Sequence, residues 1–67
     1  MLEKDKQKAI LEAILFAYSE PIAASELAKA TGFSLKETRS LLKELKVDYA
    51  FYHRGMILLQ MEDEYQL

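Results

Sequence analysis

The sequence predicts a mainly α-helical fold with a small antiparallel β-hairpin at its carboxyl end, and three observations support this prediction. Two long segments place their apolar residues at the three- and four-residue spacing of a helix. Pro21 and Gly32 bracket a shorter helical segment between them. After Gly55 the helical spacing gives way to a short apolar run and a polar turn. This order of elements is a three-helix core with a wing, that is, a winged helix-turn-helix.

Length and composition limit the classes of protein to which the chain can belong. Of its 67 residues, 51% are hydrophobic and 30% are charged, which is typical of one compact domain over residues 1–67 and not of a disordered segment. A domain of this size buries only about 60% of the surface of its unfolded chain. The chain has no cysteine, which excludes disulfides and cysteine-based zinc sites. Its net charge of -2 disfavours nucleic acid as the main ligand.

The sequence also indicates where in the cell the protein is expected. No stretch approaches the roughly 18 apolar residues that a membrane-spanning helix needs. The first residues, Met1 to Lys6, carry charges of both signs, unlike a signal peptide. We therefore expect a cytoplasmic domain that does not contact a membrane.

The first helix is expected from about Asp5 to Tyr18. From Ala9 to Tyr18 only Glu12 is polar, so the apolar surface is wider than one face of a small core requires. Phe16 lies outside the main apolar arc, and the simplest expectation is that it packs under the neighbouring loop. The remaining apolar surface leaves room for a partner.

A short extended piece at Ile22 and a second helix over about Ala24 to Thr31 are expected next. Pro21 ends the first helix, because the residue before a proline is pushed out of the α region. Ala23 or Ala24 occupies the position where a capping Ser or Asp is expected, so the second helix should be poorly capped unless Ser25 serves. Gly32 supplies a left-handed end.

The third helix is expected to begin after Ser34, which forms a capping box with Glu37. The helix should continue to about Tyr49 or Ala50. One side of it carries a stripe of residues that should face the core. These residues are Leu35, Thr38, Leu42, Leu45 and Tyr49.

The exposed part of the third helix is divided by charge. Basic residues share one flank, namely Lys36, Arg39, Lys43 and Lys46, and acidic residues share the opposite flank, namely Glu37, Glu44 and Asp48. A DNA-binding protein could use Lys36 and Lys43 for phosphate contacts and Arg39 to grip guanine with its planar fork. A solvated helix surface of mixed charge is the more ordinary interpretation.

The carboxyl end predicts the hairpin. The segment from Met56 to Met61 is apolar at five of six positions and favours a buried strand. Glu62 to Glu64 is expected to form a turn, and Tyr65 to Leu67 a second strand antiparallel to the first. Such a continuous apolar run suggests that both faces of at least part of the strand are buried, whereas the three helices can bury only one of them. A second copy, a partner protein or further carboxyl-terminal sequence would cover the other face.

The residues that carry this order of elements resemble a known family. The segment from Leu11 to Ile22, then Glu26-Leu27-Ala28, Gly32, Ser34 with Glu37, and the Leu41-Leu42-Leu45 run are similar to the amino-terminal winged-helix domain of segregation and condensation protein B, the ScpB family. Gly55 before an apolar strand and the closing Tyr65-Gln66-Leu67 resemble that family's wing. Two positions depart from the pattern: Ala23 replaces a capping Ser or Thr, and Glu62-Asp63-Glu64 replaces a glycine-rich wing tip.

The resemblance implies a bacterial chromosome-partitioning protein that dimerises and binds the kleisin subunit of the condensin complex at the nucleoid. A full chain of that family carries a second winged-helix domain. Residues 1–67 would then be the amino-terminal part of a longer protein.

We expect no enzyme activity, no catalytic residue, no metal, no cofactor and no small-molecule substrate. His53 is the single histidine and the two glycines are far apart, so neither a metal site nor a phosphate-binding loop can be assembled. Two hypotheses remain. The first is a protein-interaction module, whose candidate interface residues are Phe16, Leu58, Met61 and Tyr65. The second is a DNA-binding transcription regulator that uses Lys36, Arg39 and Lys43.

Overall fold

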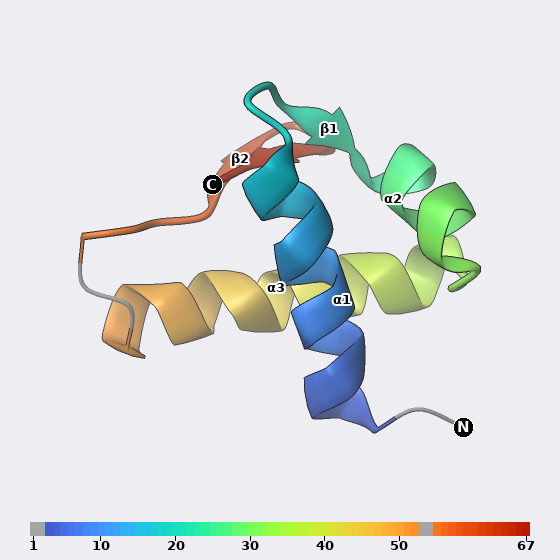
Figure 1. The fold of residues 1–67 in the computed structure, drawn as a ribbon, viewed down its shortest axis with the longest axis horizontal. Coiled ribbons are helices and arrows are strands. Elements are labelled where there is room, and N and C mark those ends of the chain that lie inside the picture. The colour runs from blue at the N-terminus through green and yellow to red at the C-terminus, as the bar shows by residue number, and fades with distance from the viewer. Residues whose placement is uncertain (1–2, 53–54) are drawn as a thin grey trace.

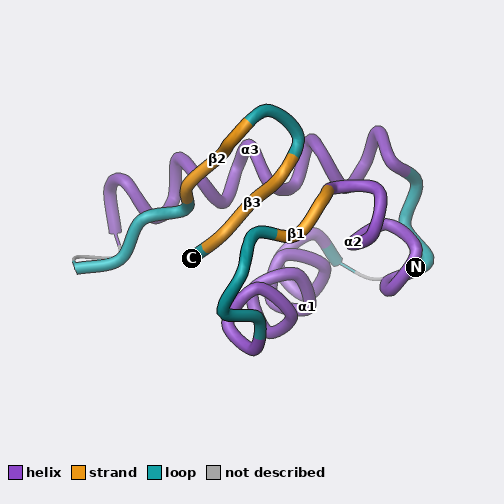
Figure 2. Tube along the Cα trace, turned by 90° about the horizontal axis from the view of Figure 1, so that it is seen from above, coloured by secondary structure: helices purple, strands orange, loops and turns teal. Residues whose placement is uncertain are grey.

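The computed structural model describes residues 3–52 and 55–67. Over these residues the chain forms helices α1 (Lys4–Ala17), α2 (Ala24–Thr31) and α3 (Leu35–Tyr52), and strands β1 (Ile22–Ala23), β2 (Leu59–Met61) and β3 (Glu64–Gln66) (Figure 1). The predicted three-helix core with a wing is confirmed. The helices α1 and α3 cross (Figure 1), and seen from above α3 extends across one side of the molecule while α1 is viewed nearly along its axis on the other side (Figure 2).

The wing is larger than the predicted two-stranded hairpin, because β1 joins it. The strand order is β1-β3-β2, and both pairings are antiparallel. Ile22 pairs with Tyr65, and Ala23 pairs with Glu64. The short extended piece between α1 and α2 therefore ties the helix-turn-helix to the wing.

The start of α2 is capped by the wing. Ala23, at the N-cap position, has no side chain that could accept a hydrogen bond, as expected from the sequence. Instead, the backbone N–H of Ala24 donates to the carbonyl oxygen of Asp63, in the turn between β2 and β3, over 2.9 Å. At the other end of α2, Gly32 adopts the predicted left-handed conformation with φ of 81°, and its N–H donates to the carbonyl of Ala28.

Ser34 caps α3 as predicted, with one difference. The Glu37 backbone N–H donates to the Ser34 hydroxyl oxygen over 3.0 Å. The Glu37 carboxylate accepts a hydrogen bond from the Ser34 hydroxyl over 3.1 Å, whereas a full capping box would direct it to the Ser34 backbone. The helix also continues to Tyr52, beyond the predicted end, because no glycine or proline interrupts it before Gly55.

The core lies between the three helices and the inner face of the sheet. Thr38 is the buried polar residue within it, and its hydroxyl donates to the Ser34 carbonyl over 2.8 Å, so its burial leaves no polar group unpaired. The apolar core residues come from every helix and from the strand region. They are Leu11, Leu15, Ile22, Ala24, Leu27, Leu41, Leu42, Leu45, Tyr49, Leu58 and Tyr65.

The prediction of a buried strand over Met56 to Met61 is wrong in two respects. The strand comprises Leu59–Met61, because β3 offers it a partner of only three residues, and β3 itself begins at Glu64. Within the run, Leu58 is buried and the other apolar residues are exposed, since the helices cover one face of the wing. None of the helices in the described part of the chain is long and apolar enough to cross a membrane.

Candidate functional site

The outer side of α1 presents an apolar surface to solvent. Leu11 and Leu15 are the buried residues of this helix. Phe16 is 70% exposed, and the expectation that it packs under the neighbouring loop is wrong. At about 100° per residue it lies on the side of α1 away from Leu11, whereas the chain after the helix turns back toward the core to form β1 (Figure 2). We call the following set the α1 face: Ala9, Ile10, Ala13, Phe16 and Ala17.

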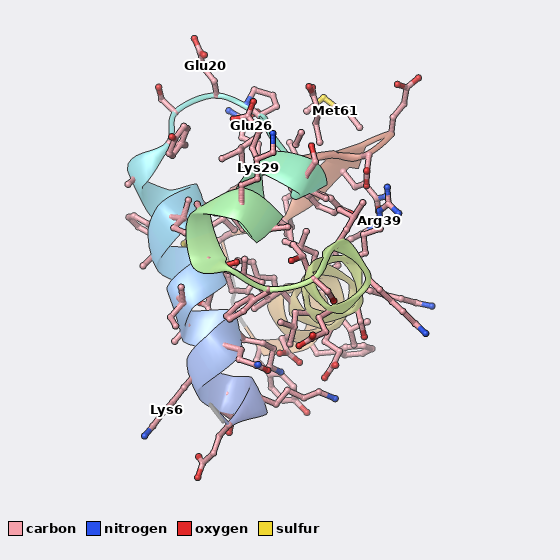
Figure 3. The ribbon with its side chains drawn as sticks, turned by 90° about the vertical axis from the view of Figure 1, so that its right-hand side faces the viewer. Lys6, Glu20, Glu26, Lys29, Arg39 and Met61 are labelled. Atoms are coloured by element: carbon pink, nitrogen blue, oxygen red, sulfur yellow. The ribbon has the colours of Figure 1, made fainter. Side chains whose placement is uncertain are left out.

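A second apolar surface lies on the outer face of β2. Leu59 and Met61 are each about half exposed, and they share one face because side chains alternate along a strand. Gln60, between them, points the other way and accepts a hydrogen bond from the Lys46 ammonium of α3 over 2.9 Å. Figure 3 shows Met61 on the side of the sheet away from α3. We call Leu59 and Met61 the wing face.

Two of the four predicted interface residues are not exposed. Tyr65 is 4% exposed because it lies on the central strand of the sheet and faces the helices. Leu58 is 5% exposed because it precedes β2 and packs into the same core. The exposure expected for these two residues is therefore wrong. Phe16 and Met61 are exposed, as the hypothesis of a protein-interaction module requires.

The end of α3 carries exposed apolar residues that the sequence analysis did not select. Val47, Phe51 and Tyr52 are all at least half exposed, and the rings of Phe51 and Tyr52 lie with their centroids 6.4 Å apart. Ile57 and Met56, in the segment before β2, are also exposed. The sequence did contain a sign of this exposed surface, because the adjacent aromatic residues Phe51 and Tyr52 follow Tyr49, the last core position of the helix.

The basic flank of α3 is partly occupied by the wing. Arg39 donates from Nε to Asp63 Oδ1 over 3.2 Å and from an Nη atom to Asp63 Oδ2 over 2.7 Å. These hydrogen bonds lower the pKa of Asp63 and raise the pKa of Arg39. The fork that was predicted to grip guanine is therefore engaged by a carboxylate of the same chain. Lys36 and Lys43, the other two predicted DNA contacts, are exposed.

The acidic flank of α3 faces α1 and forms ion pairs there. The Lys8 ammonium lies 2.8 Å from Asp48 and 3.9 Å from Glu44, and Lys4 lies 2.8 Å from Glu44. The hydrogen bond to Asp48 raises the pKa of Lys8. Two of the acidic residues of α3 therefore form ion pairs with α1. The spacing of residues within α3 gives no information about these partners.

Glu12, the one polar residue in the apolar run of α1, has a structural partner. The Tyr49 hydroxyl donates to the Glu12 carboxylate over 2.7 Å. Burial, and then this hydrogen bond, raise the pKa of Tyr49.

No group of three or more His, Cys, Asp or Glu side chains that could hold a metal ion occurs within residues 3–52 and 55–67. His53, weighed in the sequence analysis as a surface residue at the base of the wing, lies outside the described residues.

The chain is similar to a known protein family and to several of its members. The family model described as "Segregation and condensation complex subunit ScpB" matches residues 9–67. Segregation and condensation protein B of Alkaliphilus metalliredigens is 41% identical over 66 residues, which cover 98% of this chain and 35% of that protein. The protein of the same name from Caldanaerobacter subterraneus is 38% identical over 61 residues, or 91% of this chain and 36% of that protein.

A solved structure has the same fold. The crystal structure of ScpB from Mycobacterium tuberculosis matches with a TM-score of 0.90 and 24% sequence identity, over 98% of this chain and 41% of that one. The chain thus spans about a third of the length of the two curated relatives described above, 35% and 36%.

Proposed function

This chain belongs to the ScpB family of segregation and condensation complex subunits, and from this premise we propose that it is a non-enzymatic protein-interaction module. In this proposal it forms a homodimer and binds the kleisin subunit of a chromosome condensin complex, in the cytoplasm at the nucleoid. The observation that carries the proposal is the exposure of large apolar side chains, above all Phe16, on a domain whose core is already complete.

The exposed apolar residues support two separate contacts. The α1 face belongs to α1 and the wing face to β2, and Figure 2 shows these two elements in different parts of the molecule. Each square ångström of apolar surface removed from water contributes about 25 cal/mol, so both surfaces favour burial against a partner. Their separation would let one copy contact a second copy and a kleisin at the same time.

The alternative, a DNA-binding transcription regulator, is less well supported. The planar fork of Arg39 would have to leave Asp63 before it could contact a base. Lys36 and Lys43 can supply phosphate contacts, but phosphate contacts carry no sequence information. The turn between β2 and β3 is acidic, which opposes the approach of a phosphate backbone.

The proposal is tested by measuring mass with light scattering and by co-purification with a kleisin fragment. We expect the chain alone to have twice its monomer mass of 7.7 kDa and to co-elute with the kleisin fragment. Phe16→Glu and Met61→Glu should each weaken one of the two contacts. Lys36→Glu is the matched control, because it also changes the charge of an exposed helix position but lies on neither apolar surface.

A chain that stays monomeric at micromolar concentration and does not bind the kleisin fragment would contradict the proposal. Fluorescence anisotropy with duplex DNA tests the alternative. Because non-specific binding is strongest at low salt, absence of binding at about 50 mM salt would exclude it.

A further inference from the structure

Strand β2 runs alongside the basic flank of α3, and two contacts set this alignment. Lys46 donates to the Gln60 side chain over 2.9 Å, and Arg39 donates to Asp63 in the turn. The two basic residues are seven positions apart on α3, or about 10.5 Å at a rise of 1.5 Å. Their partners are three positions apart on the wing, or about 10 Å at a rise of 3.3 Å. Figure 2 shows β2 on the side of the sheet nearer α3.

The backbone of Gln60 faces the open edge of the sheet. In the strand order β1-β3-β2, β2 lies at one edge. The Ala24 N–H donates to the Asp63 carbonyl, so Asp63 directs this carbonyl toward the side of β1. Backbone groups alternate along a strand, so those of Glu64 point toward β2 and those of Tyr65 toward β1. Because Gln60 lies opposite Tyr65, its N–H and C=O point away from β3, to the open edge.

A strand added antiparallel at this edge would meet two different surfaces. Its residue opposite Gln60 would exchange both backbone hydrogen bonds and point toward α3, where the Lys46 ammonium lies. Lys43 is exposed between Arg39 and Lys46 on the same flank, and it forms no ion pair with another described residue. The neighbouring residues of the added strand would point the other way, beside the wing face. The edge therefore fits an extended segment in which one acidic residue stands between two apolar ones.

The same features disfavour two other occupants of this edge. A second copy paired through β2 would bring its own Lys43 and Lys46 against those of the first. Duplex DNA could contact these lysines, but its phosphates have no proton to donate to the Gln60 carbonyl. The charged backbone of DNA would also meet the acidic turn from Glu62 to Glu64. An acidic, otherwise apolar segment satisfies the backbone and the lysines together.

We propose that β2 binds an extended segment of a partner protein as an additional antiparallel strand, with an acidic residue of that segment opposite Gln60. This mode of recognition gives affinity through main-chain hydrogen bonds and specificity through alternate side chains. The inference rests on the proposed function, because it supplies the chemistry of a partner segment at the wing face.

A short synthetic peptide with one glutamate between two valines, flanked by threonines, is the probe. NMR titration should show binding, and a peptide with lysine in place of the glutamate should not bind. Hydrogen exchange reports strand addition directly: saturation with the peptide should slow exchange of the Gln60 amide by at least about tenfold. Attachment through the lysines alone would leave that amide unprotected and would overturn the inference.

Methylation of the peptide backbone tests the hydrogen bonds without altering the chain. A methyl group on the glutamate nitrogen removes the donor to the Gln60 carbonyl and should abolish binding. A methyl group on the nitrogen of a valine, which would point away from β2, is the matched control and should be tolerated. Equal binding by both methylated peptides would overturn the proposed register.

Variants of the chain test the two surfaces separately. Gln60→Pro removes the N–H at the open edge but no bond to β3, and it should raise the peptide dissociation constant about tenfold. Gln60→Thr keeps the N–H and should bind as well as the original chain. Lys43→Glu should raise the dissociation constant about fivefold. Lys29→Glu makes the same change at an exposed position of α2 and should have no effect.

The outcomes separate this inference from the proposed function. If the peptide does not bind but the kleisin fragment co-purifies, strand addition at β2 is overturned and the proposed function stands. If Gln60→Pro converts a dimer into a monomer, the edge belongs to a second copy and the inference is wrong. Binding of duplex DNA that Lys43→Glu abolishes, without binding of the peptide, would assign the edge to nucleic acid and likewise overturn it.

Discussion

Both carboxylate oxygens of Asp63 accept hydrogen bonds from the Arg39 guanidinium, over 3.2 and 2.7 Å, and so join the turn of the wing to α3. The backbone carbonyl of the same aspartate accepts the N–H of Ala24 at the start of α2, over 2.9 Å. One residue of the wing thus contacts both helices of the helix-turn-helix. The pairing with Arg39 gives Asp63 a structural role in a turn where the family resemblance implies glycine, and the backbone carbonyl takes the place of a side-chain cap on α2.

The pKa of Asp63 should depend on Arg39. The hydrogen bonds from Arg39 lower this pKa in the folded chain. The pair therefore contributes stability above the ordinary aspartate pKa of about 3.9, and this contribution is lost as the pH falls through the lower, folded value. In Arg39→Gln the pKa of Asp63 should rise toward the ordinary value, as followed by carbon-13 NMR of the carboxyl group.

Lys43→Gln is the matched control for this titration. It removes a positive charge from the same flank of α3, but Lys43 makes no ion pair with Asp63. An unchanged pKa of Asp63 in Arg39→Gln would show that the two residues do not interact in solution.

Leu42→Ala should remove most of the stability of the chain. Leu42 is fully buried in the middle of the core. Truncating such a side chain costs about 2 to 5 kcal/mol, comparable to the whole free energy of unfolding of a small domain. Urea denaturation measures the loss. Val47→Ala, on an exposed position of the same helix, should change the free energy of unfolding by no more than about 0.5 kcal/mol; similar losses in both variants would mean that α3 does not dock as described.

Stability should decline at alkaline pH because of Tyr49. Its pKa is raised in the folded chain by burial and by the hydrogen bond to Glu12. A raised pKa gives stability that is present below the ordinary tyrosine value of about 10 and is lost as the pH rises above it. Thermal unfolding can be followed by circular dichroism from about pH 8 to about pH 11, a range that includes the ordinary tyrosine pKa. The loss of thermal stability toward alkaline pH should be smaller in Tyr49→Phe.

The control for this experiment is Tyr52→Phe, whose ring is largely exposed. That variant should retain the alkaline decline of the original chain. Equal profiles for Tyr49→Phe and the original chain would argue against the Tyr49–Glu12 contact as a source of the pH dependence.

Gly32→Ala should destabilise the chain through the backbone alone. Gly32 has φ of 81°, which a residue with a Cβ atom adopts at a cost of about 1 to 2 kcal/mol. Apart from the residues next to it in the chain, a Cβ added at this position would meet no atom within 4 Å, so no clash with the rest of the fold adds to that cost. Gly32→Asn should lose less, because asparagine tolerates the left-handed region. Chemical denaturation compares the two, and equal losses would point to a cause other than backbone conformation.

Much of the fold was predictable because its signals are local. The bounds of α2, the extended piece at Ile22, the left-handed Gly32 and the Ser34 cap each depend on residues within a few positions of one another. Hydrophobic spacing likewise identified the buried side of α3. For the candidate site, the same reasoning identified the apolar excess of α1 and selected Phe16 and Met61 as interface candidates, and both are exposed. It wrongly expected Leu58 and Tyr65 to be exposed and Phe16 to pack under the neighbouring loop.

The sequence by itself determined which segments become helices and which of their sides are apolar, because backbone conformation and side-chain periodicity depend on near neighbours. Only the tertiary structure decided that β1 completes the sheet, that Tyr65 faces inward and that Arg39 is held by Asp63, 24 residues away along the chain. It likewise decided that Lys8 bonds Asp48, 40 residues away. Burial and ion pairing at such separations depend on how complete elements dock, and periodicity within one element carries no information about the neighbour against which it packs.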